Sequence, residues 1–339
     1  MLNHNLLISI LIITYNYEKE LLRALDAIKQ QTYTNYEVII VDDCSADNTI
    51  NTLNTYIANN PNMNIQLFQH EFNQGIAAAR NTALQHATGN YLYIHDADDW
   101  MEPNCLEELA KIAASTNADR IIGEFQDVTP TGKILQTRDI SEPSSKWFHM
   151  MHDACLYKHS IITQNNIKYI EGVWDDIGFN FQFSIYSKHI EYIHKTLFNY
   201  YVNTESTSGA KSLANKAKDI SRFNNLINLF LQNKNKLSNE DWILAEYYLI
   251  KYYYFSILHE GRYANIGDLL NRYNLLNTAM KNNLPNYRRN SNIAFFKSNC
   301  DRKYGKKVTY LLTHIEKLHL MKPLLIVYHW ISKLTYIPA

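Results

Sequence analysis

The sequence predicts an α/β fold: a doubly wound, mostly parallel sheet flanked by helices, with a helical extension at the C-terminus. Two observations predict it. Over roughly the first 125 residues, short β-branched apolar runs alternate with segments of helical periodicity. The polar clusters of this region follow the ends of those runs, which is where an open parallel sheet binds its ligands.

Each predicted element follows from its own pattern. Residues 6–14 form a continuous apolar run, as a strand covered on both faces does. Residues 18–31 place their leucines and Ile28 on one helical stripe. By the same criteria the sequence predicts further strands at 36–41, 64–69, 91–95 and 119–126. It predicts further helices at 46–58, 74–87 and 103–115.

The second half of the chain differs in character. A polar stretch at 141–145 interrupts the alternation, and beyond residue 215 the sequence is helical and rich in Tyr, Leu and Asn. We place a domain boundary near 208–213, which divides the chain into domains 1–210 and 211–339.

Composition and charge exclude several classes of protein. The chain has 33 Lys+Arg and 33 Asp+Glu, so we expect no nucleic-acid partner. Its four scattered cysteines form no metal or redox motif and fit a reducing compartment. The first apolar run is too short to cross a bilayer and lacks the flanks of a signal peptide. We therefore expect the protein in the cytoplasm or at the inner face of the cell membrane.

Three polar clusters mark the predicted ligand site, and each follows a strand: Thr14-Tyr15-Asn16, Asp42-Asp43 and Asp96-Ala97-Asp98-Asp99. Asp96 and Asp98 can reach one cation between them, and their hard oxygens suit Mg²⁺ or Mn²⁺. Such an ion can screen the negative charge that builds on a diphosphate when the diphosphate is the leaving group of a reaction. The alternative is a solvated turn or a helix cap, for which Asp is common.

Two further features support a nucleotide site. Gly75 permits a tight turn before a helix that carries Arg80, whose planar fork can meet a phosphate or a base edge. Asp42 and Asp43 can accept hydrogen bonds from a pyrimidine or a ribose. Alternatively, Arg80 pairs with an acid at the sheet end, and the two aspartates cap the helix that starts near Ala46.

Four ordered segments carry a resemblance to a known family. They are ILIITYN (10–16), VIIVDDCSADN (38–48), NQGIAAARN (73–81) and YLYIHDADDW (91–100). Together they resemble the family-two glycosyltransferases of the GT-A fold over about residues 6–210. The resemblance makes 1–210 a catalytic domain that binds a nucleotide-sugar. The remaining helical domain would serve acceptor binding, oligomerisation or membrane association.

The resemblance implies a role for each matching residue. Asp96 and Asp98 would hold Mn²⁺ or Mg²⁺, and Asp99 would orient their loop. One departure is Thr14, which stands where the family has proline before the Tyr-Asn pair. The residues that would bind the nucleotide, commonly uridine diphosphate, are Thr14, Tyr15, Asn16, Asp42, Asp43 and Arg80.

Two fainter segments complete the resemblance. In YIEGVWDD (169–176), Asp176 matches the family's general base, while Asp175 stands in place of its usual Glu, beside Trp174. An acid pair at a helix start is the alternative. The segment 200–208 is similar to a loop that closes over the diphosphate. There Ser206 and Ser208 would donate hydrogen bonds, and Asn203 replaces the usual Arg.

The implied activity is an inverting, metal-dependent hexosyl- or N-acetylhexosaminyl-transfer from a UDP-sugar to a cell-surface glycan, teichoic acid or lipid-linked oligosaccharide. A catalytically inactive binding partner with this fold is one alternative. The presence of Asp96, Asp98 and Asp176 together argues against it. A sugar-phosphate nucleotidyltransferase is another. It needs a Gly-rich basic loop after the first strand, where this chain has Tyr15-Asn16-Tyr17-Glu18.

The C-terminal region offers further partners. Its tyrosines can stack on acceptor sugars, as in the segment 246–258, or serve packing or a homo-oligomer. The stretch 303–336 carries six lysines among apolar residues, a pattern typical of a helix that lies on an anionic membrane. Ordinary packing is the alternative.

Overall fold

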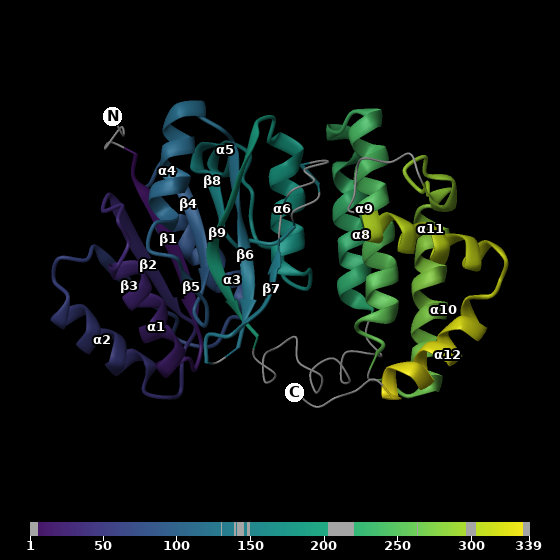
Figure 1. Cartoon of the computed structure of the whole chain (residues 1–339), viewed down its shortest axis with the longest axis horizontal. Coiled ribbons are helices and arrows are strands. Elements are labelled where there is room, and N and C mark those ends of the chain that lie inside the picture. The colour runs from purple at the N-terminus through teal and green to yellow at the C-terminus, as the bar shows by residue number, and fades with distance from the viewer. Residues whose placement is uncertain are drawn as a thin grey trace. The chain divides into compact units, whose positions relative to one another are not determined.

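The computed structural model describes residues 6–129, 131–138, 140, 146–147, 150–202, 220–262, 264–295 and 303–334 (Figure 1). The chain divides into two compact units. The first runs to Val202, except for 142–149 and 172–174, which belong with 203–339 to the second. The domain boundary that we expect near residue 210 lies outside the described residues.

A mixed sheet forms the first unit, and its parallel half matches the predicted strands. β1 (Ile8–Thr14) lies between β2 (Tyr36–Asp42) and β4 (Tyr91–Asp96) and is parallel to both. β3 (Ile65–Gln69) pairs in parallel with β2 at the edge. The carboxyl ends of these strands therefore share one edge of the sheet.

The other half of the sheet is largely antiparallel. β8 (Cys155–Lys158) is antiparallel to both β4 and β6 (Arg120–Val128), while β9 (Ile190–Tyr201) runs parallel to β6. Two short strands complete the sheet by antiparallel pairing, β5 (Trp100–Met101) with β9 and β7 (Ile134–Arg138) with β6. The sequence predicts no strand beyond residue 126, because the patterns of β7, β8 and β9 are short or irregular.

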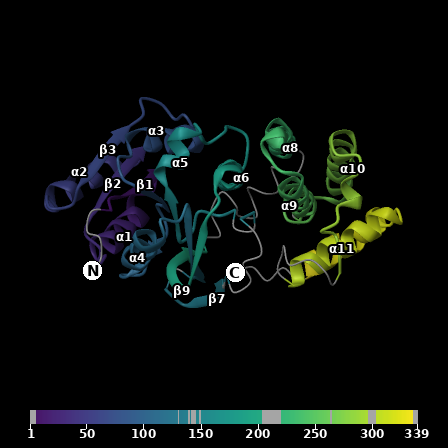
Figure 2. The ribbon, with the colours of Figure 1, turned by 90° about the horizontal axis from the view of Figure 1, so that it is seen from above.

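Helices cover both faces of this sheet, as Figure 2 shows. One face packs against α1 (Glu18–Lys29), α2 (Thr49–Asn59) and α4 (Cys105–Thr116). The other packs against α3 (Ile76–His86), α5 (His159–Gln164) and α6 (Asp175–Tyr186). The expected start of α2 near residue 46 is wrong. The Asp47 carboxylate accepts hydrogen bonds from the Thr49 amide (3.1 Å) and hydroxyl (2.6 Å). Because of this turn, the helix begins only at Thr49.

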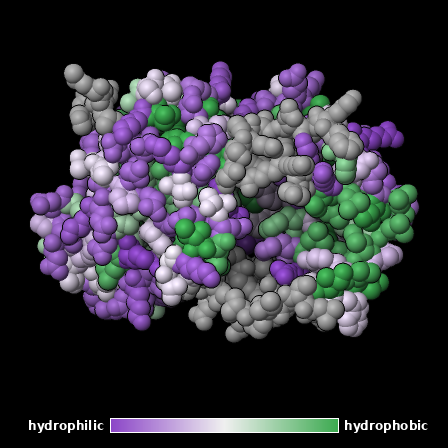
Figure 3. All heavy atoms as spheres, in the orientation of Figure 1, coloured by the Kyte–Doolittle hydropathy of each residue, from purple (hydrophilic) through white to green (hydrophobic). Residues whose placement is uncertain are grey.

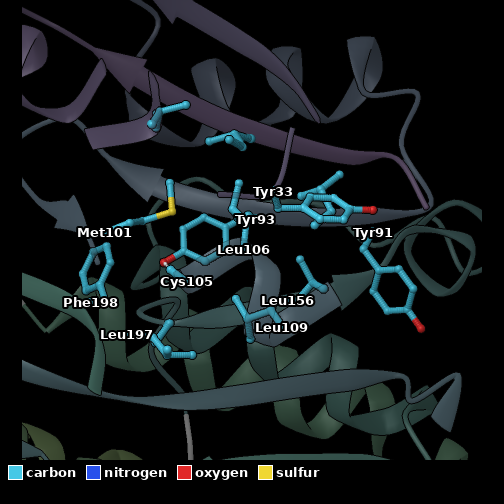
Figure 4. Packing of buried hydrophobic residues seen from close by; sticks show 14 of the residues in the cluster. Tyr33, Tyr91, Tyr93, Met101, Cys105, Leu106, Leu109, Leu156, Leu197 and Phe198 are labelled. Carbon is cyan, nitrogen blue, oxygen red and sulfur yellow. Dashed lines mark hydrogen bonds between the residues drawn. The ribbon is translucent and has the colours of Figure 1, made fainter. Parts of the chain in front are cut away.

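The core consists of one apolar layer on each face of the sheet. Ile10 and Ile12 of β1 point into the layer that α1 and α4 cover, while Leu11 points into the opposite layer. Figure 4 shows part of the first layer, with Tyr93, Leu106 and Leu109 close together. Because both faces of β1 are buried, its sequence is a continuous apolar run and not an alternating one.

The second unit is helical. Ser238 and Asn265 begin its two longest helices, and their side chains accept hydrogen bonds from the amides of Asp241 and Asp268. None of the described helices is long and apolar enough to cross a membrane. The helices of this unit are α8 (Ser221–Asn233), α9 (Asn239–Leu258), α10 (Ile266–Asn283), α11 (Lys303–Lys317) and α12 (Met321–Leu334), with short 3₁₀ turns η1 (Lys234–Lys236) and η2 (Tyr287–Arg289).

A buried carboxylate joins the helices of the second unit. Glu316 of α11 is fully buried and accepts hydrogen bonds from the Tyr253 hydroxyl of α9 (2.5 Å) and the Tyr287 hydroxyl of η2 (2.7 Å). Tyr254 of α9 (3.1 Å) and Tyr273 of α10 (3.4 Å) also donate to it. Four tyrosines thus serve internal packing here. Sugar stacking by other tyrosines stays a prediction.

Candidate functional site

The structure brings the three predicted polar clusters to one edge of the sheet. β1 ends at Thr14, β2 at Asp42 and β4 at Asp96, and in the strand registers Thr14 lies opposite Asp42 and Ile13 opposite Asp96. The strand-end rule therefore correctly predicts that residues more than 50 positions apart along the chain become neighbours.

Asn16 and Asp42 tie two loops of this edge together. The Asn16 amide donates to the Ser45 hydroxyl (2.9 Å), and its side-chain carbonyl accepts from the Ala46 amide (2.8 Å). Asn16 has a φ of 58°, a conformation that Asn tolerates better than most residues. Asp42 in turn binds the amide (3.0 Å) and hydroxyl of Ser45. Both side chains thus shape the rim of the site.

Asp43 organises the turn before α3. Its buried carboxylate pairs with the His70 imidazole (2.7 Å) and accepts from the amides of Gln74 (2.9 Å) and Gly75 (2.8 Å). The alternative interpretation, that Asp42 and Asp43 cap a helix starting near Ala46, does not hold, because α2 begins at Thr49 and neither carboxylate binds its first amides. Asp43 caps α3, because Gly75, with a φ of 87°, turns its amide toward this carboxylate.

Thr14 and Tyr15 differ in their surroundings. Tyr15 is exposed at the end of β1, whereas Thr14 is buried. Among the described residues, the Thr14 hydroxyl has no hydrogen-bond partner. A buried hydroxyl without a partner is costly, so this group is free to bind a ligand or water at the site.

Asp96-Ala97-Asp98, called the acidic triplet here, lies at the start of a loop that contacts with α1 and the end of β9 hold in place. The buried Asp99 carboxylate accepts from the Tyr201 amide at the end of β9 (2.7 Å). Arg23 of α1 lies over the rings of Trp100 (4.4 Å) and Tyr201 (4.7 Å), and its Nη2 donates to the Asp98 carbonyl (2.5 Å). The carboxylates of Asp96 and Asp98 remain only partly buried. Arg23 was not predicted as a residue of this site, because its partners lie far along the chain.

Arg80 contacts acidic residues from two separate segments, the end of β4 and the start of α6. Its buried guanidinium donates through Nη2 to Asp96 (2.9 Å), and its Nη1 lies 2.8 Å from an Asp175 carboxylate oxygen. It also lies over the Tyr169 ring, 5.2 Å from the ring centre. Arg80 therefore does pair with an acid at the end of a strand, which was the alternative interpretation of this residue. The predicted contact of Arg80 with a nucleotide stays a prediction.

Asp176 follows Asp175 in the first turn of α6. Burial, and to a smaller extent the charge of Asp175, raises the pKa of Asp176 to about 8. This carboxylate is therefore a stronger base than an ordinary one. Trp174 belongs to the second unit and is partly buried. Asn203, Ser206 and Ser208 lie outside the described residues.

Negative charge accumulates at this edge. Burial and the Asp96 charge raise the pKa of Asp98 to about 6 and that of Asp153 to about 7. Asp153, just before β8, was not predicted, because nothing in the sequence shows that β8 lies beside β4. Carboxylates that repel one another in this way favour a bound cation.

The donor set fits Mg²⁺ or Mn²⁺. Among the described residues no group of three or more His, Cys, Asp and Glu side chains is arranged to hold a metal by itself. Two carboxylates, Asp96 and Asp98, suit an ion that completes its shell with water and substrate phosphates. His95 instead serves packing, with its buried ring edge-on to Phe198 at 5.6 Å between ring centres. Its Nδ1 binds the Asp96 carbonyl (2.7 Å), and burial lowers its pKa to about 4.

Comparison with known proteins decides the family. Residues 9–173 match the model of the family described as Glycosyl transferase family 2. This part of the chain is a family-2 glycosyltransferase domain. The chain is also 29% identical over 255 residues to the uncharacterized glycosyltransferase YibD of Escherichia coli K12, which covers 70% of this chain and 73% of YibD.

Solved structures agree on the GT-A fold of this glycosyltransferase. Staphylococcus aureus TarS 1–349 in complex with UDP-GlcNAc matches with a TM-score of 0.53 at 17% identity, over 81% of this chain and 91% of that one. The mannosyltransferase PcManGT of Pyrobaculum calidifontis, in complex with GDP-Man and Mn²⁺, matches with a TM-score of 0.56 at 17% identity, over 97% and 87%. At these identities the likeness shows the fold alone.

Proposed function

We propose that this glycosyltransferase transfers a sugar from a UDP-sugar, with inversion and with Mn²⁺ or Mg²⁺, to a hydroxyl of a cell-surface glycan, teichoic acid or lipid-linked oligosaccharide. One observation carries the proposal. Arg80 bridges Asp96 of the acidic triplet to Asp175, the neighbour of Asp176. One guanidinium therefore contacts a carboxylate proposed for metal binding and the direct neighbour of the carboxylate proposed as base.

On the donor side, Asp96 and Asp98 hold the cation. When bound, the ion neutralises charge on the diphosphate as the sugar departs. Arg80 fixes one oxygen of Asp96 and so sets the direction of the other. Thr14, Tyr15, Asn16, Asp42 and Asp43 shape the nucleotide pocket. The complexes of TarS with UDP-GlcNAc and of PcManGT with GDP-Man and Mn²⁺ support a nucleotide-sugar and a divalent cation.

On the acceptor side, Asp176 removes the proton of the attacking hydroxyl. The acceptor oxygen forms a bond to C1 of the sugar, and the bond from C1 to the phosphate oxygen breaks, with its electron pair leaving on the diphosphate. Attack from the face opposite the leaving group inverts the configuration. A base with a pKa of about 8 lies close to a neutral working pH, where the ionised fraction and the strength of a general base are best balanced.

The acceptor class rests on the relatives. TarS is named a poly(ribitol-phosphate) beta-N-acetylglucosaminyltransferase and is 26% identical over 171 residues, which cover 48% of this chain and 29% of TarS. A polymer or lipid-linked acceptor at the inner face of the cell membrane is consistent with that relationship. Acceptor binding belongs in this proposal to the helical domain 211–339.

The metal requirement is tested by release of UDP from a panel of UDP-sugars, with Mn²⁺ and with EDTA. We expect release with Mn²⁺ to fall at least about a hundredfold in EDTA and in Asp98→Asn, because both remove the charge that stabilises the departing diphosphate. Glu191→Gln is the control. It removes a carboxylate of the same unit that lies on β9 and pairs with His189. Release that persists in EDTA or in Asp98→Asn contradicts the proposal.

A further inference from the structure

Helix α11 has its polar side inward and an apolar side outward. It buries Thr309, Thr313 and Glu316 against the second unit, together with Leu312. Val308 and Leu311, by contrast, are exposed, and Leu318 is exposed just beyond the helix end. These three positions recur at the spacing of one helical stripe. The outward stripe of α11 is therefore more apolar than its packed side.

Helix α12 also has apolar residues on its outward side. Its exposed positions include Ile326, Val327, Trp330 and Ile331, while it buries Met321 and Leu325 together with His329 and Ser332. Trp330 is 64% exposed, a high value for the largest apolar side chain. The two helices contact each other.

Exposed apolar residues concentrate on this helix pair. Eighteen large hydrophobic residues are exposed in the described part of the chain, and eight of them lie in the short stretch from α11 to α12. Figure 3 shows hydrophobic residues gathered over the region where Figure 1 draws α10 to α12. A patch of this kind marks an interaction surface. We call the following eight residues the apolar face: Val308, Leu311, Leu318, Leu320, Ile326, Val327, Trp330 and Ile331.

The charges beside the apolar face are of one sign. Lys317 and Lys322 are exposed around the α11–α12 turn, and Lys306 and Lys307 lie near the start of α11. From residue 303 to the end of the sequence, the only acidic residue is Glu316. That carboxylate is buried in the tyrosine network. The surface of this segment is therefore apolar and cationic.

We propose that α11 and α12 lie in the interface of an anionic lipid bilayer. The apolar face would enter the boundary between headgroups and acyl chains, and the lysines would contact anionic headgroups. α12 has 14 residues, too few to cross a bilayer, so the pair would lie in the plane of the membrane. A second copy of the chain on the same face would bring lysines against lysines, which favours the membrane as the occupant. The inference does not rest on the proposed transfer reaction.

The test is cosedimentation of the full chain with vesicles of phosphatidylcholine, with and without phosphatidylglycerol. We expect binding only with the anionic lipid. We expect the triple substitution Leu311→Gln/Val327→Gln/Trp330→Gln to weaken it at least about a hundredfold, because each apolar group lost from the interface lowers the partition. The matched control is Ile134→Gln/Leu135→Gln, two positions of β7 that are 53% exposed, against 54% for Val327. This control should bind as the unaltered chain does.

A second variant guards against misfolding of the first. Lys317→Gln/Lys322→Gln leaves the apolar face intact, and we expect each lost lysine to weaken binding about fivefold, with less effect at high salt. Equal binding to neutral and anionic vesicles, or no binding at all, would overturn the proposal. So would a dimer in solution that the triple substitution dissociates, since the apolar face would then be a contact between copies. UDP release, measured separately without vesicles, reports on the transfer reaction independently.

Discussion

Arg80 shows how much one side chain contributes to this site. Each arm of its guanidinium meets a different carboxylate, Asp96 and Asp175, and Tyr169 covers its face. Lysine carries the same charge but lacks the planar fork that serves two partners at once. The charge of Arg80 and its shape therefore make separable contributions.

Arg80→Lys tests this separation. We expect UDP release to fall at least about tenfold and the free energy of unfolding of the first unit to fall by about 2 kcal/mol, because one buried carboxylate loses its partner. Urea unfolding and the UDP-release assay measure the two effects. Arg289→Lys, at an exposed position, is the control and should change neither. Full activity in Arg80→Lys would show that charge alone suffices.

The ionised form of Asp176 should lower the free energy of unfolding, although it is the form that serves catalysis. Its pKa is higher in the folded protein than in the unfolded chain, because burial and Asp175 disfavour its charge. Below the unfolded pKa of about 4, Asp176 therefore does not lower the free energy of unfolding. As the pH rises from there through the folded pKa of about 8, the loss of free energy of unfolding grows.

We accordingly expect Asp176→Asn to bind UDP normally, to lose sugar transfer by at least about a hundredfold, and to be more stable than the unaltered chain by at least about 1 kcal/mol at pH 8. At pH 4 the stability gain should vanish. Calorimetric UDP binding, a transfer assay and denaturant unfolding at both pH values measure these effects. Loss of UDP binding would contradict the assignment of Asp176 as the base.

At the scale of elements, Glu316 connects several helices of the second unit. Its carboxylate joins α11 to α9, α10 and η2 through tyrosine hydroxyls and the Arg288 guanidinium. A charge so deeply buried is stable only when its oxygens are fully hydrogen-bonded. The packing of these helices therefore depends on polar contacts as well as on apolar ones.

Removal of single hydroxyls should reveal this dependence. We expect Tyr253→Phe, which deletes the 2.5 Å hydrogen bond, to destabilise the second unit by about 2 kcal/mol. Tyr273→Phe deletes the 3.4 Å contact and serves as the internal control, with an expected loss below about 0.5 kcal/mol. Thermal unfolding followed by tyrosine absorbance measures both. Equal losses would mean that the bond lengths do not rank the contributions.

At the scale of the whole molecule, the division into two units makes a prediction about ligand linkage. A ligand that binds only the folded first unit stabilises that unit by mass action, by about 2.7 kcal/mol at a hundred times its Kd. The second unit has its own helical core and should not share this gain. We expect two steps in denaturant unfolding, with only one shifted by UDP and Mn²⁺. A single step that shifts as a whole would contradict independent domains.

The sequence alone determined the strands β1, β2, β3, β4 and β6, the helices between them and the edge where the polar clusters meet. These features depend on local periodicity and on where each strand ends. The sequence therefore places Asp43, Arg80, Asp96 and Asp98 near this edge of the sheet.

Only the tertiary structure decided which side chains support those residues. Arg23 lies 75 positions from Asp98, and Asp153 reaches the site because β8 inserts antiparallel beside β4. Asp43 caps α3 and not α2, because the turn at Gly75 brings amides from 31 and 32 positions away. Likewise, the exposed apolar stripes of α11 and α12 appear only once the packed side of each helix is known. Contacts between distant segments depend on strand order and helix packing, which periodicity along the chain does not specify.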